Sequence, residues 1–341
     1  MTEKLIKKIL KKYGYDVVKI YPEQSGYRNK SYAVDVMHLY DSVRAKNILP
    51  LQRKRNLILY KNEQGIIKKI QNANAVSNFL AEQGIPSRKS LGKIIRLHDE
   101  KIERFACLYN YLPGETISWE AYNKEHIKLL GKAMSDMHFY LKDYSKKDKL
   151  ESIDEIIKNQ ANKMIQYFKK EGVRNAMVRK LGLICNINFI NKFVGAENLR
   201  PLQNIYSDQS IPLHMDLVRS NVLFDLDKNK DIFISGIIDF EKVAKGNRIF
   251  DIARTLAFLL VDCKYKDPVK IRKYFLISGY KKRELEDLPD LTHLNYLIYY
   301  FLTYDFYKFL RHNPYESLNS NEHFIRTKNF LLSKKILISC S

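Results

Sequence analysis

The chain has 341 residues, 45% of them apolar, which suffices for a hydrophobic core and favours about two globular domains. Its 59 basic and 38 acidic residues give a formal net charge of +21, but the basic residues are scattered, so we expect no specific nucleic-acid partner. There is no apolar run that would span a membrane, no secretion signal and no CxxC pair among four cysteines, so a cytoplasmic protein without zinc or disulfides is predicted.

The first part of the chain predicts a small, mostly antiparallel sheet. Residues 4–13 read as an amphipathic helix, and packing on the first domain is favoured over a membrane-surface role because Gly14 ends the helix and strands follow. A second helix is expected at residues 66–83, before Gly84. Strands are expected at residues 15–21, 31–36, 56–61, 94–97 and 104–111.

Beyond Pro113-Gly114 the pattern becomes helical. Helices are expected at residues 126–141, 153–169, 176–193, 251–260 and 291–310. Apolar runs at residues 222–224 and 232–234 flank a polar link, which indicates a hairpin. The prediction is an α+β protein with an N-terminal lobe at residues 1–112, a helical C-terminal lobe at residues 113–341, and a ligand cleft between the lobes.

Three polar residues around the predicted hairpin have the spacing that phosphoryl transfer requires. Asp216 is a carboxylate that can orient a hydroxyl nucleophile. Asn221 and Asp239 offer oxygen ligands of the kind that Mg²⁺ prefers. Taken singly, each residue is more simply a turn or cap residue. Their joint order favours a phosphotransfer site.

The same residues carry a family resemblance. His214-Met-Asp216-Leu-Val-Arg-Ser-Asn221, followed by Ile-Ile-Asp239-Phe-Glu, resembles the aminoglycoside phosphotransferase and choline kinase family, whose pattern is HGDxxxxN, then IDxE or IDFE, then an Asp before a helix. Asp251 matches that last Asp. Residues 25–29, 109–115 and 130–138 look like the family's phosphate-covering loop, its linker and its first large-lobe helix, so the resemblance covers most of the chain.

The resemblance implies a protein-kinase-like, two-lobed fold. It implies that Asp216 is the catalytic base and that Asn221 and Asp239 bind Mg²⁺. His214 and Asp251 would support the catalytic loop rather than react. The nucleotide would be held by residues of the N-terminal lobe, namely Lys61, Asn29 and the backbone near Asn110 and Tyr111.

The chain departs from the family pattern at two places. Met215 replaces the usual glycine, which is tolerable if the backbone there is not left-handed. The family's nucleotide lysine pairs with a helix glutamate, but residues 71–75 contain no carboxylate. An amide there would bind the lysine less strongly than a charged partner. Lys61 is the best candidate for the lysine, and a slip in alignment would put Ile58 or Tyr60 at that position instead.

The histidines and Trp119 do not indicate another functional site. The histidines form no HxH or HExxH spacing, so zinc hydrolysis is not expected, and His138 reads as a core histidine. Trp119 reads as a packing residue rather than a platform for substrate.

We therefore expect a kinase that moves the γ-phosphate of ATP or GTP to a hydroxyl of a small molecule. The net charge of +21 disfavours a polycationic aminoglycoside, although Glu241, Asp262 or acids in residues 284–290 would make the local cleft acidic. The alternative is a nucleotide-binding pseudokinase, motivated by the missing helix carboxylate. A nucleic-acid-associated protein is a third possibility on charge alone. No sequence feature indicates an oligomeric state.

Overall fold

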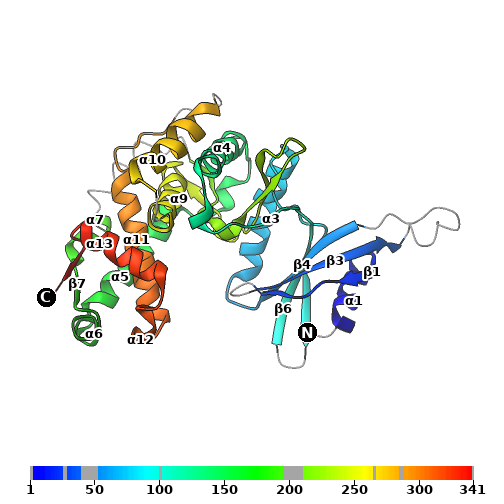
Figure 1. Cartoon of the computed structure of the whole chain (residues 1–341). Helices are drawn as coiled ribbons and strands as arrows, with labels where there is room; N and C mark the ends of the chain where they lie inside the picture. Colours follow the sequence, from blue (N-terminus) through cyan, green and yellow to red (C-terminus); the bar gives the residue numbers. More distant parts are fainter. Residues whose placement is uncertain are drawn as a thin grey trace. The chain divides into compact units, whose positions relative to one another are not determined.

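The chain folds into two compact units (Figure 1). The computed structural model describes residues 3–25, 29–39, 53–99, 102–194, 210–263, 266–283 and 288–339. Unit 1 comprises Met1–Gly114 with Ser235–Glu241, and unit 2 comprises Glu115–Ile234 with Lys242–Ser341. The sequence suggested one boundary at residues 112 and 113, and it did not indicate that Ser235–Glu241 returns to unit 1.

Unit 1 is built on an antiparallel sheet of six strands in the order β1-β3-β4-β6-β5, with β2 paired to β3. The strands are β1 (Tyr15–Ile20), β2 (Gln24–Ser25), β3 (Lys30–His38), β4 (Arg53–Lys61), β5 (Ile95–Asp99) and β6 (Ile102–Asn110). The helices are α1 (Glu3–Lys12) and α3 (Ile66–Glu82). The expected antiparallel N-terminal sheet is confirmed.

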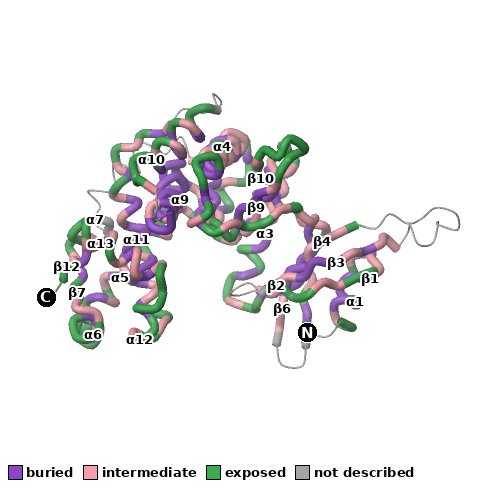
Figure 2. The backbone as a smooth tube through the Cα atoms, viewed as in Figure 1, coloured by how far each residue is buried: buried purple, intermediate pink, exposed green. Residues whose placement is uncertain are grey.

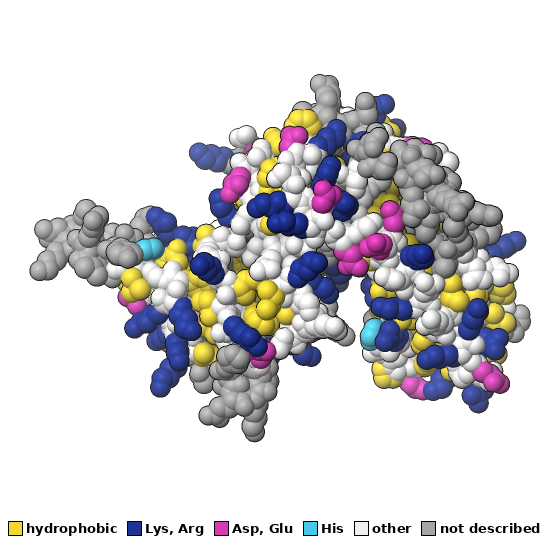
Figure 3. Space-filling model, turned by 180° about the vertical axis from the view of Figure 1, so that it is seen from behind, with side chains coloured by type: hydrophobic (Ala, Val, Ile, Leu, Met, Phe, Trp, Pro, Cys, Tyr) yellow, Lys and Arg dark blue, Asp and Glu magenta, His cyan; other side chains and the backbone are white. Residues whose placement is uncertain are grey.

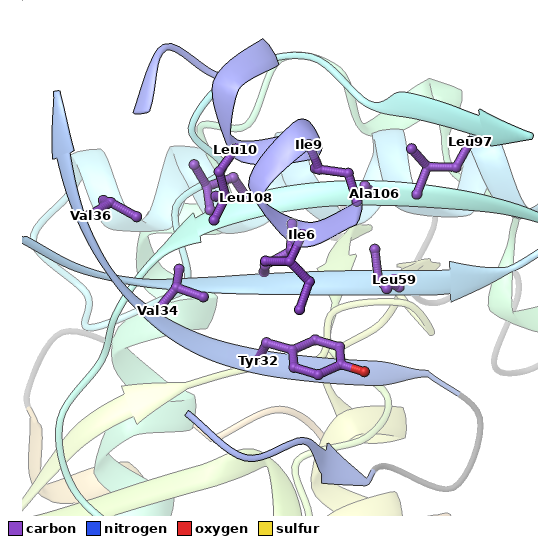
Figure 4. Packing of buried hydrophobic residues seen from close by; sticks show 11 residues of the cluster. Ile6, Ile9, Leu10, Tyr32, Val34, Val36, Leu59, Leu97, Ala106 and Leu108 are labelled. Atoms are coloured by element: carbon purple, nitrogen blue, oxygen red, sulfur yellow. The ribbon is translucent and has the colours of Figure 1, made fainter. Parts of the chain in front are cut away.

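The two faces of this sheet are covered by different helices. Alternate residues of a strand point to opposite faces, so Leu57 and Leu59 of β4 pack with α1 on one face (Figure 4). Ile58 and Tyr60 pack on the other face in a cluster that includes Ile66 of α3. The faces that the β4 side chains occupy are therefore fixed by burial on both sides of the sheet.

Unit 2 is mostly helical. Its longer helices are α4 (Lys124–Leu141), α5 (Ile153–Lys169), α6 (Glu171–Leu181), α7 (Ile187–Val194), α9 (Ile249–Asp262), α11 (Leu294–His312) and α13 (Glu322–Ser333). Shorter ones are α10 (Pro268–Arg272), α12 (Tyr315–Leu318) and a π-helical segment, Lys273–Tyr280. Helix α9 is buried along almost its whole length and forms the centre of this unit (Figure 2).

Three short strand pairs complete the description: β9 (Val222–Leu226) with β10 (Ile232–Ile237), β8 (Ile211–Leu213) with β11 (Ala244–Gly246), and β7 (Leu183–Cys185) with β12 (Leu337–Ser339). The predicted hairpin at β9 and β10 is present. The single helix expected at residues 176–193 is wrong. Gly182 adopts φ 62° and ends α6, and the next residues pair with β12 near the C-terminus.

Helix α4 and the π-helical segment approach each other through two glycines. A Cβ atom on Gly131 would lie 2.2 Å from the carbonyl oxygen of Phe275, and one on Gly279 would lie 2.6 Å from that of Lys128. Both distances are far below van der Waals contact. Only glycine therefore fits at either position without moving a backbone.

Several exclusions made from the sequence can be compared with the described residues. None of the helices described is both long and apolar enough to cross a membrane. Cys107, Cys185 and Cys263 are free and buried, and Cys340 lies outside the described residues. Lysine and arginine side chains are spread over the face seen in Figure 3 rather than gathered into one patch.

Candidate active site

Asp216 lies in a buried loop that follows a short strand. Strand β8 pairs with β11 in antiparallel register, with Leu213 opposite Ala244. Residues 211–217 are all buried, and Asp216 is 8% exposed. A 3-10 turn, Arg219–Asn221, then leads directly into β9. The loop is therefore anchored by a strand on each side.

Asp251, in the first turn of α9, holds the backbone of this loop. Its carboxylate accepts hydrogen bonds from the N–H of His214 at 2.8 Å and of Met215 at 2.6 Å. Burial would raise the pKa of Asp251, but a hydrogen bond and charge from His138, with His214, outweigh it and lower the pKa. Asp251 is thus an ionised acceptor for two backbone donors, which is what a bracing role requires.

His138 of α4 continues this brace. Its Nε2 lies 3.2 Å from Asp251 Oδ2, and its Nδ1 lies 2.8 Å from the hydroxyl of Tyr280. His138 is fully buried, as a core histidine would be, but the sequence interpretation missed its partners. They come from α9 and the π-helical segment, more than 100 residues away in the chain.

Met215 has a left-handed backbone, with φ 60°. The expectation that methionine is tolerated there depended on the opposite conformation, and that condition is not met. A left-handed residue with a Cβ costs about 1–2 kcal/mol. The hydrogen bond from its N–H to Asp251 and the burial of its side chain, 7% exposed, offset this cost.

Asn221 fixes the position of Asp216. Its Nδ2 donates to the Asp216 carbonyl oxygen at 2.8 Å and to the carboxylate Oδ2 at 3.2 Å. Its Oδ1 accepts a hydrogen bond from the Ser220 hydroxyl at 3.2 Å. An amide oxygen has two lone pairs, so Oδ1 retains capacity for a further ligand.

Lys242 was not foreseen as part of this site. Its Nζ lies 2.7 Å from Asp216 Oδ1. Burial would raise the pKa of Asp216, but the charges of Lys242 and Arg254 outweigh this and lower it below the ordinary value. Asp216 is therefore ionised at neutral pH, as a proton acceptor must be. Adjacency to the Ile-Ile-Asp239-Phe-Glu motif was the one signal for Lys242.

Asp239 belongs to unit 1. It directly follows Ile238 and has a left-handed backbone, φ 64°, which aspartate tolerates better than most residues. The N–H of Ile237 donates to Pro86 O at 2.7 Å, and Ile237 O accepts from the N–H of Arg88 at 3.2 Å. In the same unit, Asn29 Nδ2 donates to Glu241 Oε1 at 2.9 Å.

Tyr60, rather than Lys61, faces α3. The Tyr60 hydroxyl lies 2.9 Å from that of Tyr109, which donates to Asn74 Oδ1 of α3 at 2.9 Å. Lys61 is exposed at the end of β4, on the opposite face of the strand. The nucleotide role of Lys61 stays a prediction.

Arg88 brings a cation to the α3 face of the sheet. Its guanidinium carbon lies 5.4 Å from the centre of the Tyr109 ring. Burial raises the pKa of Tyr60, and the charge of Arg88 opposes that shift. Arg88 therefore lies beside the Tyr60–Tyr109 pair, on the face of the sheet that α3 covers. No sequence motif indicated it.

The other predicted nucleotide residues are engaged in unit 1. The N–H of Asn110 donates to Lys89 O at 3.0 Å, and Asn110 Oδ1 accepts from the Lys89 N–H at 2.6 Å. The ammonium of Lys54 lies 4.3 Å from the centre of the Tyr111 ring. Asn29 Oδ1 is 3.4 Å from the N–H of Lys61. Their contact with a nucleotide stays a prediction.

The predicted Mg²⁺ ligands suit that ion chemically. Asn221 Oδ1 has a lone pair to offer, and the Asp239 carboxylate accepts a long hydrogen bond of 3.4 Å from the Glu241 N–H. Within the described residues, no group of three or more His, Cys, Asp or Glu side chains forms a metal cage. Mg²⁺ bound with a nucleotide needs one or two protein oxygens, since phosphates and water fill the remaining positions.

An antiparallel sheet unit, a helical unit and a braced loop with a buried, ionised aspartate define the class of protein-kinase-like phosphotransferases. The chain belongs to the phosphotransferase enzyme family, whose model matches residues 52–264, more than half of the chain. The predicted family and the protein-kinase-like fold are thereby confirmed. No curated protein matches the sequence.

Solved structures with the same fold cover nearly the whole chain. An amicoumacin kinase in complex with AMP-PNP, Ca²⁺ and Ami has a TM-score of 0.66 at 15% identity, covering 98% of this chain and 94% of that one. A spectinomycin phosphotransferase with ADP and spectinomycin has 0.56 at 16%, covering 96% and 94%. A microcompartment-associated aminopropanol kinase has 0.57 at 12%, covering 98% of both. At these identities the likeness shows the fold.

Proposed function

We propose that this protein transfers the γ-phosphate of ATP or GTP to a hydroxyl group of a small molecule. The observation that carries the proposal is the Asp216 carboxylate, buried, ionised and fixed by Asn221 on a loop that Asp251 holds. Membership of the phosphotransferase family supports it. Three structural relatives are described as complexes with AMP-PNP, ADP or GDP, which supports a nucleotide as donor.

In the proposed reaction Asp216 accepts the proton of the acceptor hydroxyl. The hydroxyl oxygen forms a bond to the γ-phosphorus, the bond from that phosphorus to the β-phosphate oxygen breaks, and the nucleoside diphosphate leaves. Lys242 has to move away from one carboxylate oxygen to admit the hydroxyl, and its side chain, 54% exposed, has room to do so. Asn221 and Asp239 would hold Mg²⁺, which neutralises phosphate charge when bound.

A pseudokinase is the second candidate, and the α3 face of the sheet favours it. Asn74 accepts a hydrogen bond from Tyr109 where a family member would place a carboxylate opposite its lysine. Measuring the melting temperature with ATP or GTP, with and without Mg²⁺, shows whether nucleotide binds. Following labelled γ-phosphate with a panel of small alcohols then separates the candidates. Phosphorylated product establishes the kinase, whereas Mg²⁺-dependent binding without product across the panel establishes the pseudokinase.

Arg88 and Lys61 are the two candidate residues for binding the nucleotide phosphates, and matched substitutions distinguish them. We expect Arg88→Gln to raise the KM for ATP about tenfold or more, because a hydrogen bond to a charged group contributes about 1.5–3 kcal/mol. Lys61→Gln removes the same charge from the exposed end of β4 and should change KM less than about twofold. Steady-state kinetics with ATP varied is the measurement. The reverse result would return the role to Lys61.

A further inference from the structure

A cavity with a volume of about 380 Å³ lies among four helices of unit 2. Helix α9 contacts α10, α11 and α13 there (Figure 1). Ligand pockets in proteins range from about 300 to 1,000 Å³, so the cavity has room for a small organic molecule. Pro268, Asn295 and Lys334, which line it, are exposed, so the cavity opens to solvent.

The cavity is separate from the loop that carries Asp216. Asp251, in the first turn of α9, bonds the backbone of that loop, and Leu260, which lines the cavity, follows nine residues later. Nine residues of α-helix span about 14 Å. The cavity and the candidate active site therefore lie toward opposite ends of α9. None of the residues that line the cavity takes part in the proposed reaction.

The polar side chains of the cavity are cations or hydrogen-bond donors. Arg272 of α10 and Lys334, which follows α13, supply two positive charges, and Asn295 and Tyr299 of α11 supply an amide and a hydroxyl. Among the described residues that line the cavity, none is acidic. Within the described part of the chain, none of these four side chains has a hydrogen bond or an ion pair. Their donors are therefore available to a ligand.

The acidic residues nearby in the chain have partners of their own. Asp262 Oδ1 lies 2.6 Å from Nδ1 of His323. The Asp267 carboxylate caps α10, where it accepts hydrogen bonds from two backbone N–H groups at 2.7 and 3.4 Å. Residues 284–287, which the sequence suggested for an acidic cleft, lie outside the described residues. Neither Asp262 nor Asp267 therefore supplies a counter-charge to Arg272.

Arg272 is the cation with most to gain from an anion. Its side chain is partly buried, and this burial lowers the pKa of the guanidinium from its ordinary value. A charge removed from water costs free energy unless an opposite charge or hydrogen bonds compensate for it. A guanidinium pairs with a planar carboxylate through two parallel hydrogen bonds. A carboxylate is therefore the anion that suits this position.

The walls of the cavity are largely apolar. The rings of Tyr299 and Phe330 lie 5.9 Å apart, measured between their centres. Leu260 and Pro268 add aliphatic surface. The ammonium of Lys334 lies 5.7 Å from the centre of the Phe330 ring. Positive charge and aromatic surface therefore occur together, and a ligand that uses both has an anionic group on an apolar body.

We propose that this cavity binds a small aromatic carboxylic acid, with its carboxylate on Arg272 and Lys334 and its ring against Tyr299 and Phe330. An inorganic anion would leave the apolar walls in water. A neutral ligand would leave Arg272 without a counter-charge. The site lies outside the proposed phosphate transfer, so it is a second binding site of unit 2.

The test compares three probes of one size: 3-phenylpropanoate, 3-phenylpropanamide and 3-phenylpropan-1-amine. At neutral pH they carry a negative charge, none and a positive charge, and propanoate serves as the acid without its ring. Ligand-observed NMR on the full-length protein gives the dissociation constants. We expect the acid to bind about fivefold or more tightly than the amide, with the amine weakest. Propanoate should bind about tenfold more weakly than the aromatic acid, because it buries less apolar surface.

Substitutions locate the binding site of the acid. Arg272→Gln should weaken binding of the acid about fivefold or more and bring its affinity close to that of the amide. Arg174→Gln is the matched control, because Arg174 is an exposed arginine of α6 and its variant has the same net charge. It should leave the dissociation constant within about twofold of the wild type.

Two further variants test the other contacts. Lys334→Gln should weaken binding of the acid about threefold or more, and its exposed position makes it the variant to use if Arg272→Gln does not fold. Phe330→Leu should weaken the acid and the amide by the same factor, because it alters the wall and leaves the charges. Circular dichroism shows whether each variant is folded.

Tighter binding of the acid that Arg272→Gln and Lys334→Gln both reduce, and that Arg174→Gln leaves intact, supports the second site. The absence of saturable binding, or an acid that binds no more tightly than the amide or the amine, overturns it. So does tight binding that persists in Arg272→Gln or Lys334→Gln, or that is lost equally in Arg174→Gln. Displacement of the acid by ADP with Mg²⁺ would place it at a nucleotide site and would also overturn it. None of these measurements uses phosphate transfer, so they test the cavity whether or not the protein is a kinase.

Discussion

Replacing Asp216 by asparagine is expected to lower kcat for phosphate transfer by about 10²–10⁴-fold, the range attributed to a positioned general base. Asparagine keeps the size of the side chain and can accept the hydrogen bond from Asn221 Nδ2, but it cannot take up a proton. The nucleotide KM should change less than about threefold, because the substitution removes an interaction that matters in the transition state. Steady-state kinetics give kcat and the nucleotide KM, and circular dichroism shows whether the variant is folded.

Asp231→Asn provides the control for this substitution. Asp231 is an exposed residue directly before β10, and its variant carries the same change in net charge. We expect its kcat and KM to stay within about twofold of the wild type. If Asp216→Asn instead retained full activity while folded, the role of Asp216 as base would have to be abandoned.

Asp305→Asn is expected to destabilise the protein by about 3–5 kcal/mol, because it leaves Arg254 buried without its counter-charge. The Arg254 and Asp305 side chains are each only 6% exposed. A loss of this size is a large part of the 5–15 kcal/mol that stabilises an ordinary domain. Urea denaturation followed by circular dichroism gives the difference in the free energy of unfolding.

The urea denaturation experiment has a matched surface control, and the stabilising contribution of Asp305 is expected to depend on pH. Asp148→Asn breaks an ion pair with Lys245 in which Asp148 is 79% exposed, and it should leave the free energy of unfolding nearly unchanged, because solvent screens exposed ion pairs. Burial would raise the pKa of Asp305, but Arg254 and Lys308 lower it far below the ordinary value. The contribution of Asp305 is therefore fully present above its unfolded pKa of about 3.9 and is lost as pH falls toward the folded pKa.

The free-energy difference between wild type and Asp305→Asn should accordingly be constant above about pH 5 and narrow below about pH 4. Unfolding curves at a series of pH values test this. A difference that is small at pH 7, or that grows toward acid, would mean that the buried pair does not stabilise the fold in the way described.

The features that the sequence predicted well are local and repetitive. The spacing of apolar residues in β3 and β4 indicates strands. Every second side chain of a strand points to the same face of the sheet, where it packs into a buried cluster. The motif around Asp216 and Asn221 indicated that these two side chains lie together, and Asn221 does donate hydrogen bonds to Asp216. Both inferences depend on neighbours within about ten residues along the chain.

What the sequence did not predict depends on distant partners. The expected helix at residues 176–193 is interrupted because Leu183–Cys185 pairs with Leu337–Ser339, a contact that no local pattern encodes. His138 could be read as buried, but its contact with Asp251 follows from the packing of α4 near α9. The left-handed backbone at Met215 likewise depends on a carboxylate 36 residues further along the chain.

The close approach of α4 to the π-helical segment limits how this protein can change during evolution. From Gly131 to His138 the helix makes about two turns, so a shift at the glycine moves the histidine that contacts Asp251. A larger residue at Gly131 or Gly279 would disturb that alignment, because packed interiors transmit strain. The glycine pair should therefore resist substitution even in relatives that act on a different acceptor.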